Sequence, residues 1–154
     1  MQQPQSQKHE DPDFETRVRD SFARQPMMQT LGAKLAAVRK GEVEVELPFR
    51  ADLTQQHGFL HAAAVTAIAD NACGYAALTM MEKDADVLSV EFKVNLLAPA
   101  VGERFIAVGK VLRAGKTLSV CSGEVYALQG TSRKLIGAMQ ATMISSRPRE
   151  SAVR

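Results

Sequence analysis

The sequence lacks the features that identify disulfide-rich, membrane-spanning and secreted proteins. It contains no tryptophan, and aromatic residues make up 5% of its 154 positions. Its two cysteines, Cys73 and Cys121, are too few for a disulfide framework, and we interpret them as reduced core thiols. No apolar run reaches the length of a membrane span. The opening MQQPQSQKHEDPDF lacks the apolar stretch of a secretory signal, so the sequence predicts a cytoplasmic protein with no membrane partner.

Charge of neither sign dominates. The chain carries 19 lysine and arginine residues against 17 aspartate and glutamate residues, a formal net charge of +2. Affinity for nucleic acid comes largely from neutralising phosphates, which requires a stronger basic excess. We therefore expect no nucleic-acid partner, whereas local basic patches can still hold a phosphorylated small molecule.

The composition and its changes along the chain predict one folded domain. Hydrophobic residues make up 45% and charged residues 23% of the sequence, as is typical of a globular protein. Residues 1–12 are polar and contain Pro4 and Pro12, so we interpret them as a disordered tail. Residues 13–146 form the expected domain, and residues 147–154 form a polar C-terminal tail.

Two kinds of periodicity predict the secondary structure. Apolar residues recur every four positions at Phe14, Val18 and Phe22, which indicates an amphipathic helix that Pro26 ends. Strict alternation over 43–47 indicates a half-buried strand within a hairpin. Further on, four segments rich in strand-forming residues are separated by glycine-containing turns, which predicts antiparallel strands. These strands are expected at 87–97, 103–112, 117–128 and 134–145.

Between the hairpin and these strands, the segment from Ala62 to about Met81 predicts a long helix that is apolar on nearly all sides. Asp70 and Asn71 are its only strongly polar interior residues. Such a helix must be buried over most of its surface. One helix can be buried so completely only if the sheet wraps around it. The element order therefore predicts an α+β fold, with one curved antiparallel sheet around a long central helix.

Asp70 is the first candidate for a catalytic residue. A carboxylate in an apolar helix is costly unless it is paired, hydrogen-bonded or functional. One interpretation is that a local donor, such as Thr66 or Asn71, satisfies it. The interpretation that we favour is a general base or nucleophile tuned by its surroundings.

The start of the same helix offers a second catalytic group. The N–H groups of Ala62 and Ala63 lie in the first turn, where the helix dipole favours negative charge and an oxyanion can bind. Ala62 and Asp70 are eight residues apart, which is roughly 12 Å along a helix. A base and an oxyanion donor must both approach one reacting carbon, so a single chain cannot supply both. If both groups are catalytic, two subunits share the site.

Three sequence segments carry a resemblance to a known family. HGFLHAAAVTAIADNACGYAAL resembles the helix motif of hotdog-fold acyl-CoA thioesterases, especially the phenylacetate-pathway (PaaI-like) group. The family pattern is an Asn, then Gly-x-x-His-Gly-Gly, then a small-residue helix with an Asp. SVEFKVNLLAPAVGE and KVLRAGKTLSVCSGEVY resemble the family's central strand and next hairpin. This chain has His-Ala-Ala instead of His-Gly-Gly, and Gln55 instead of the Asn, as in one branch of 4-hydroxybenzoyl-CoA thioesterases.

The resemblance implies a hotdog fold and hydrolysis of an acyl-CoA to a free acid and CoA. Asp70 falls on the carboxylate that activates water or attacks the thioester, and Ala62 falls on the N–H that polarises its carbonyl. Gln55 and Ser89 fall on positions that orient the water or the thioester oxygen. The residues expected to bind substrate are His57, Gly58, His61, Ala63, Lys93, Arg113 and Lys116. Of these, Lys93, Arg113 and Lys116 are expected at the CoA phosphates.

The resemblance also implies a homo-oligomer, either a dimer or a dimer of dimers, with active sites at the subunit interface. It implies no cofactor and no metal. The small alanines of the helix, together with Met27, Met28, Met80 and Met81, favour an apolar acyl tail, either aromatic or of medium length.

Other interpretations of the same residues stay open. His57 and His61 near Asp70 could form a metal site, but Gly58 weakens a helix through both histidines. Cys73 could be a nucleophile, but no histidine lies within a helical turn of it. The main rival is a module that binds acyl-CoA without turnover, although such a module has no reason to bury Asp70. A hotdog dehydratase is a further rival, whose motif the sequence lacks.

Overall fold

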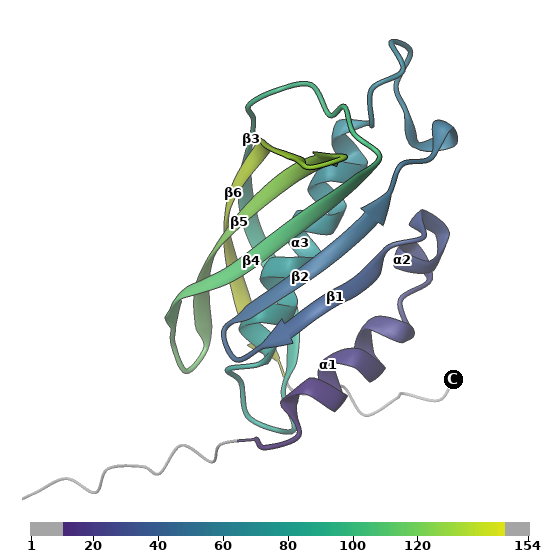
Figure 1. Ribbon diagram of the computed structural model, residues 1–154. Coiled ribbons are helices and arrows are strands. Elements are labelled where there is room, and N and C mark those ends of the chain that lie inside the picture. Colours follow the sequence, from purple (N-terminus) through teal and green to yellow (C-terminus); the bar gives the residue numbers. More distant parts are fainter. Residues whose placement is uncertain (1–10, 147–154) are drawn as a thin grey trace, which may run out of the picture.

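The computed structural model describes residues 11–146 of the chain (Figure 1). The predicted tails lie outside these residues, except that Asp11 and Pro12 precede the first helix. Every predicted helix and strand is present, with ends that fall within three residues of the expected positions. The helices are α1 (Phe14–Ala23), α2 (Pro26–Leu31), the short 3-10 helix η1 (Ala51–Leu53) and α3 (Ala62–Leu78). The strands are β1 (Lys34–Arg39), β2 (Glu42–Pro48), β3 (Asp86–Leu96), β4 (Arg104–Ala114), β5 (Leu118–Gln129) and β6 (Ser132–Ser146).

Pro26 does more than end a helix. Helix α1 stops at Ala23, and Pro26 then occupies the first turn of α2. Proline fits there because the first N–H groups of a helix have no partner within the helix. Met28 and Leu31 of α2 are buried, whereas Met27 is 56% exposed. The segment after α1 is therefore anchored through one face of a second, short helix that the sequence did not predict.

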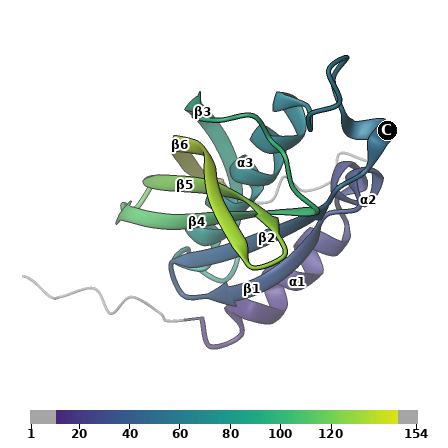
Figure 2. The same cartoon turned by 45° about the horizontal axis from the view of Figure 1, so that its top comes forward.

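The strands form one antiparallel sheet in the order β1-β2-β4-β5-β6-β3. In β2 the alternation has its expected effect, since Val43, Val45 and Leu47 are fully buried. The glutamates between them face outward, where Glu42 and Glu44 pair with Arg39. The two views show the sheet curving around α3 (Figure 1 and Figure 2).

Two glycines allow α3 to lie close against the middle of the sheet. Gly109 of β4 and Gly123 of β5 are directly opposite each other. A Cβ at Gly109 would lie 2.2 Å from the backbone of Ala72, and one at Gly123 would lie 2.9 Å from the Cys73 sulfur. Glycine is therefore required here by the close approach of a helix backbone to the sheet.

The two cysteines lie in this contact region, buried and unbonded to each other. Burial raises the pKa of the Cys73 thiol, and it raises the pKa of Cys121 to about 11. The thiols are therefore protonated at neutral pH, and the interpretation of Cys73 as a nucleophile loses its support because the thiolate is the reactive form.

Arg17 fastens α1 to the end of α3. Its guanidinium donates hydrogen bonds to the carbonyl oxygens of Leu78 at 3.0 Å and Met81 at 3.2 Å, and to two more in the following turn. The carbonyl of Leu78, the last residue of α3, has no partner within the helix, and one planar side chain binds it together with three carbonyls of the following turn. This contact holds the next part of α1 beside α3, where it forms one wall of a cavity.

The architecture is a hotdog fold, with the long helix α3 packed against strands β2 to β6 of the curved sheet. The fold prediction is thus confirmed. Within residues 11–146, no helix is long and apolar enough to cross a membrane.

Candidate functional site

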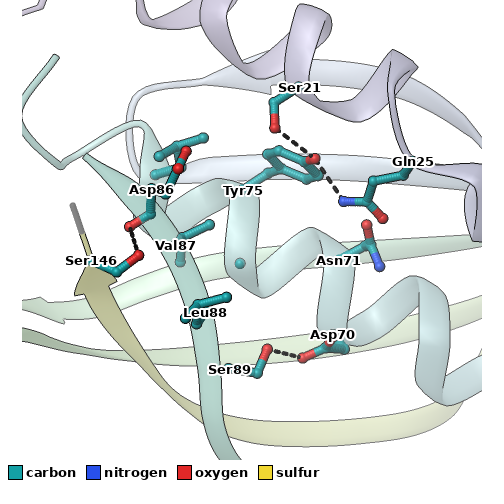
Figure 3. A pocket seen from close by; sticks show the side chains of 12 residues that line it. Ser21, Gln25, Asp70, Asn71, Tyr75, Asp86, Val87, Leu88, Ser89 and Ser146 are labelled. Atoms are coloured by element: carbon teal, nitrogen blue, oxygen red, sulfur yellow. Dashed lines mark hydrogen bonds between the residues drawn. The ribbon is translucent and has the colours of Figure 1, made fainter. Parts of the chain in front are cut away.

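The larger of two cavities surrounds Asp70. It has a volume of about 780 Å³ and lies between α3, α1 and the beginning of β3 (Figure 3). Asp70 is half-buried, and its Oδ1 accepts a 2.6 Å hydrogen bond from Ser89 Oγ. The donor therefore comes from a strand across the cavity and not from the helix itself, so a carboxylate satisfied by Thr66 or Asn71 is ruled out. A carboxylate with one oxygen held and a cavity beside it is well placed to take a proton from water.

The rest of this cavity is more polar than the sequence predicted. The Tyr75 hydroxyl accepts a 2.7 Å hydrogen bond from Gln25 Nε2 and lies 3.2 Å from Ser21 Oγ (Figure 3). None of the four methionines expected near an apolar tail is among its described lining residues. These lining residues are Ser21, Gln25, Asp70, Asn71, Gly74, Tyr75, Leu78, Asp86, Val87, Leu88, Ser89 and Ser146.

A second cavity, of about 410 Å³, lies at the beginning of α3. Ala62 and Gln55 line it, together with Leu96 and Leu97 from the end of β3. The Gln55 side-chain oxygen accepts a hydrogen bond from the N–H of His57, which fixes the amide within its loop.

His61 determines which N–H groups are free at this end of α3. It is the N-cap residue, and its Nδ1 accepts a 2.9 Å hydrogen bond from the N–H of Ala63. The expectation that Ala63 offers a second free donor is therefore wrong. The N–H of Ala62 has no acceptor within residues 11–146. One donor, at the positive end of the helix dipole, is thus available to an oxyanion.

The predicted catalytic residues separate into two pairs. Asp70 and Ser89 share the larger cavity, and Ala62 and Gln55 share the smaller one. Neither cavity contains both the Asp70 carboxylate and the N–H donor at the start of α3. The separation expected from helix geometry is therefore present.

Other predicted residues are less closely placed. His57 and Gly58 are exposed in the loop before α3, where Gly58 has a φ of +82°. In the described part of the chain, no group of three His, Cys, Asp or Glu side chains is close enough to hold a metal. His57 and His61 therefore form no metal site with Asp70 here.

The three cations proposed for CoA are not gathered at one place. Lys93 is exposed in the middle of β3, whereas Arg113 and Lys116 are exposed at the turn between β4 and β5. Figure 1 shows this turn at the end of the sheet opposite the loop that precedes α3. Their assignment to the CoA phosphates stays a prediction.

Sequence reasoning missed Ser21 and Gln25 as cavity residues. Ser21 lies on the face of α1 that carries Val18 and Phe22, since these positions are one, three or four residues apart, and Gln25 lies between α1 and α2 as the N-cap residue of α2. For Ser21, a polar side chain on the buried face of an amphipathic helix was the available signal.

Strand β3 was predicted, but its position at the sheet edge was not. Large apolar side chains of β3 are 44–59% exposed, at Leu88, Val90, Phe92 and Leu96. Leu97, directly after the strand, is 53% exposed. Such an edge is unusual for a protein that acts alone, because it offers both unpaired backbone groups and apolar surface.

Comparisons with known proteins identify the family of this chain. Residues 57–134 match the family model described as Thioesterase superfamily. A crystal structure of a thioesterase family protein from Silicibacter pomeroyi is 48% identical, with a TM-score of 0.86, and the match covers 88% of this chain and 99% of that one. A Saccharolobus solfataricus protein, named as a candidate esterase, is 34% identical over 109 residues, which are 70% of this chain and 77% of that protein.

The phenylacetate-pathway resemblance is weaker in structure. The E. coli PaaI protein, from the phenylacetic acid degradation operon, is 15% identical with a TM-score of 0.77, over 87% of this chain and 94% of that one. Similarity at this level establishes the shared fold, and the subgroup stays a prediction.

Proposed function

Because the chain belongs to the Thioesterase superfamily, we propose that it hydrolyses acyl-CoA thioesters to a free acid and CoA, at sites shared by two subunits. The observation that carries this proposal is the division of the two catalytic functions between separate cavities. Asp70 lies in a cavity that does not include the start of α3, and the free Ala62 N–H lies in a cavity whose described lining has no carboxylate. Two copies of the chain can complete each other.

The position of strand β3 at the sheet edge supports a specific arrangement of the two subunits. It contributes Val87, Leu88 and Ser89 to the larger cavity, and Leu96 with Leu97 to the smaller one. A two-fold axis pairs an edge strand with its copy in antiparallel orientation, so the start of one strand lies beside the end of the other. This pairing brings the Asp70 cavity of one subunit to the Ala62 cavity of the second, and it covers the exposed apolar edge.

The chemistry follows from these positions. Asp70, held through one oxygen by Ser89, accepts a proton from water as the water oxygen bonds to the thioester carbon, or attacks that carbon directly. The carbonyl oxygen becomes an oxyanion and accepts a hydrogen bond from the Ala62 N–H of the second subunit. The carbon–sulfur bond then breaks and CoA leaves as a thiolate that takes up a proton. If Asp70 attacked directly, water then hydrolyses the resulting acyl anhydride, which releases the free acid and restores the carboxylate. Gln55 lies beside Ala62, where its amide can orient the thioester oxygen.

The polar wall of the larger cavity and the free N–H of Ala62 favour hydrolysis of a thioester over binding of a ligand without turnover. We keep the cytoplasm as the expected compartment and the phenylacetate-pathway group as the expected subgroup. CoA is the expected carrier, with Lys93, Arg113 and Lys116 as candidates for its phosphates, and no cofactor is expected.

The test is thiol release from a panel of acyl-CoAs by the wild-type protein and by Asp70→Asn. Release that collapses in the variant, with an unchanged oligomeric state and thermal midpoint, supports the proposal. A folded wild-type oligomer that binds the panel and releases no thiol would instead be a binding module.

A further inference from the structure

Histidine is an unusual residue to cap a helix, and His61 has this position at the start of α3. Asn, Asp and Ser are the preferred N-cap residues, because a small side chain with an oxygen accepts an N–H of the first turn. His61 accepts the N–H of Ala63 with Nδ1 of its ring, at 2.9 Å. A smaller side chain would cap the helix equally well, so helix stability alone does not explain a histidine here.

Within residues 11–146, the N–H groups at the start of α3 all have acceptors except one. The N–H of His61 donates to the carbonyl oxygen of Leu53 at 2.8 Å. The N–H of Ala63 donates to the ring of His61, and the N–H of Ala64 donates to the His61 carbonyl oxygen at 3.0 Å. The exception is the N–H of Ala62. His61 therefore supplies two of the three acceptors that leave Ala62 as the single free donor.

The hydrogen bond to the ring determines where a carbonyl oxygen can bind. Successive residues of a helix differ by about 1.5 Å along its axis and roughly 100° around it. If the Ala63 N–H were also free, the oxygen could bind to it, or lie between the two donors and away from Ala62. A displacement of about 1 Å at a reacting group can slow a reaction strongly. With Ala63 occupied, the oxygen has one position.

The ring also caps the helix without a negative charge. A carboxylate at the N-cap would interact with the positive end of the helix dipole in place of the oxyanion and would repel it. Helix α3 has no acidic residue in its first turn, whereas α1 has Glu15 there. Nδ1 accepts a hydrogen bond only when the ring is neutral and has its hydrogen on Nε2. His61 thus leaves the positive end of α3 available to an anion.

We propose that His61 is a positioning residue of the shared site. It directs the oxyanion to the Ala62 N–H by occupying the neighbouring N–H of Ala63 with a neutral acceptor. This inference rests on the proposed thioesterase function and goes beyond it. It gives His61 a role that acts through Ala62, in place of the direct contact with substrate that the family resemblance implies.

Three substitutions of His61 in the full-length protein separate the acceptor from its charge. His61→Ala removes the acceptor, so kcat for the best substrate of the acyl-CoA panel should fall about tenfold with little change in KM. His61→Asn restores a neutral acceptor and should recover most of this loss. His61→Asp restores a charged acceptor, so kcat should stay low although the thermal midpoint is at or above that of the wild type. A wild-type kcat in His61→Ala, or equal kcat values in His61→Asp and His61→Asn, would overturn the proposal.

Thr79→Val is the matched control for a loss of helix stability. Thr79 is the C-cap residue of the same helix, and it is not among the described lining residues of either cavity. Its hydroxyl donates a 2.7 Å hydrogen bond to the carbonyl oxygen of Ala76 and accepts one of 2.7 Å from the N–H of Gly41. The thermal midpoint should fall, as in His61→Ala, whereas kcat should stay close to that of the wild type. A tenfold loss of kcat in this control would show that the stability of α3 determines turnover, and would overturn the role of His61.

A double variant tests whether His61 acts through Ala62. Ala62→Pro deletes the donor, so the ring of His61 then has no free N–H to reserve. Adding His61→Ala to Ala62→Pro should therefore lower kcat by about twofold or less, because the two changes affect one interaction. A further loss of about tenfold would show that His61 acts independently of the donor, and would overturn the proposal.

The state of the ring can be measured without turnover. Nitrogen-15 NMR of the wild-type protein at mildly alkaline pH should show the His61 ring with its hydrogen on Nε2. A hydrogen on Nδ1 would overturn this inference even if the protein is an active thioesterase. A protein with the expected ring that releases no CoA from any thioester would instead overturn the proposed function.

Discussion

The cavity beside Asp70 and the cavity beside Ala62 contain different catalytic groups. The larger one has a carboxylate, a hydroxyl that holds it and a long polar wall, but it does not include the N-terminal turn of α3. The smaller one has a free N–H at a helix start and an amide, but no acidic side chain among its described lining residues. They lie at different levels of the same helix, and β3 joins them. This difference is the basis of the proposal that two chains share each site.

Asp70→Asn should have the largest effect on the larger cavity. The amide is nearly isosteric, but it cannot accept the proton, so kcat should fall by about 10³ or more. Binding of a non-hydrolysable acyl-CoA analogue and the thermal midpoint should stay close to those of the wild type. Full turnover by a folded Asp70→Asn protein would remove the carboxylate from the reaction.

Ala62→Pro removes the N–H that we propose as the oxyanion donor of the smaller cavity. Proline is favoured at the first helical position, and the preceding His61 already has an extended conformation, with a ψ of 139°, that proline accepts. Loss of an oxyanion donor should lower kcat by about 10²-fold to 10³-fold. Ala62→Gly keeps the N–H and is the control, so a similar loss in that variant would point to helix distortion instead.

Ser89→Ala tests how the larger cavity holds its base, because it removes the hydrogen bond to Asp70 but keeps the carboxylate. Asp70 loses its 2.6 Å hydrogen bond and its fixed orientation, so kcat should fall by about tenfold. Ser89→Thr retains a hydroxyl and should recover part of the activity. If neither variant differs from the wild type in steady-state kinetics, the hydrogen bond has no part in catalysis.

Arg17→Ala should have the smallest effect on turnover and a clear effect on stability. Four hydrogen bonds from a charged side chain to the end of α3 and its turn are lost, which should lower the free energy of unfolding by about 2 kcal/mol. Because Arg17 fastens the wall of the larger cavity alone, KM should rise with little change in kcat. Urea denaturation and steady-state kinetics measure both effects, and unchanged stability would show that α1 is held by its apolar face alone.

The parts of this molecule that could be predicted from sequence are those that depend on local periodicity. The alternation at Val43, Val45 and Leu47 and the all-round apolarity of α3 each determine what an element must bury. The separation of Ala62 from Asp70 follows from helix rise alone, which is why the spacing of these two residues already predicts a shared site. The family resemblance implied that Ser89 positions the water, whereas the structure shows a direct hydrogen bond from Ser89 to Asp70.

The remainder depends on how distant segments meet. No local pattern states that β3 follows β6 at the sheet edge, because strand order is set by the packing of the whole chain. Ser21 and Gln25 become part of the cavity only when Arg17 fixes α1 against α3. The side chain of His61 accepts the hydrogen bond from the N–H of Ala63, and this contact depends on a rotamer that the sequence does not specify.

The most direct test of the shared site is complementation between two inactive variants. Asp70→Asn and Ala62→Pro, carrying different affinity tags, would be co-expressed, and the doubly tagged oligomers would be isolated and assayed for thiol release. Random pairing of the two chains gives a heterodimer with one intact site and one doubly altered site, so the unfractionated mixture should recover about a quarter of wild-type activity. Isolated heterodimers that remain as inactive as either parent would show that each chain builds its site alone, and would contradict the account.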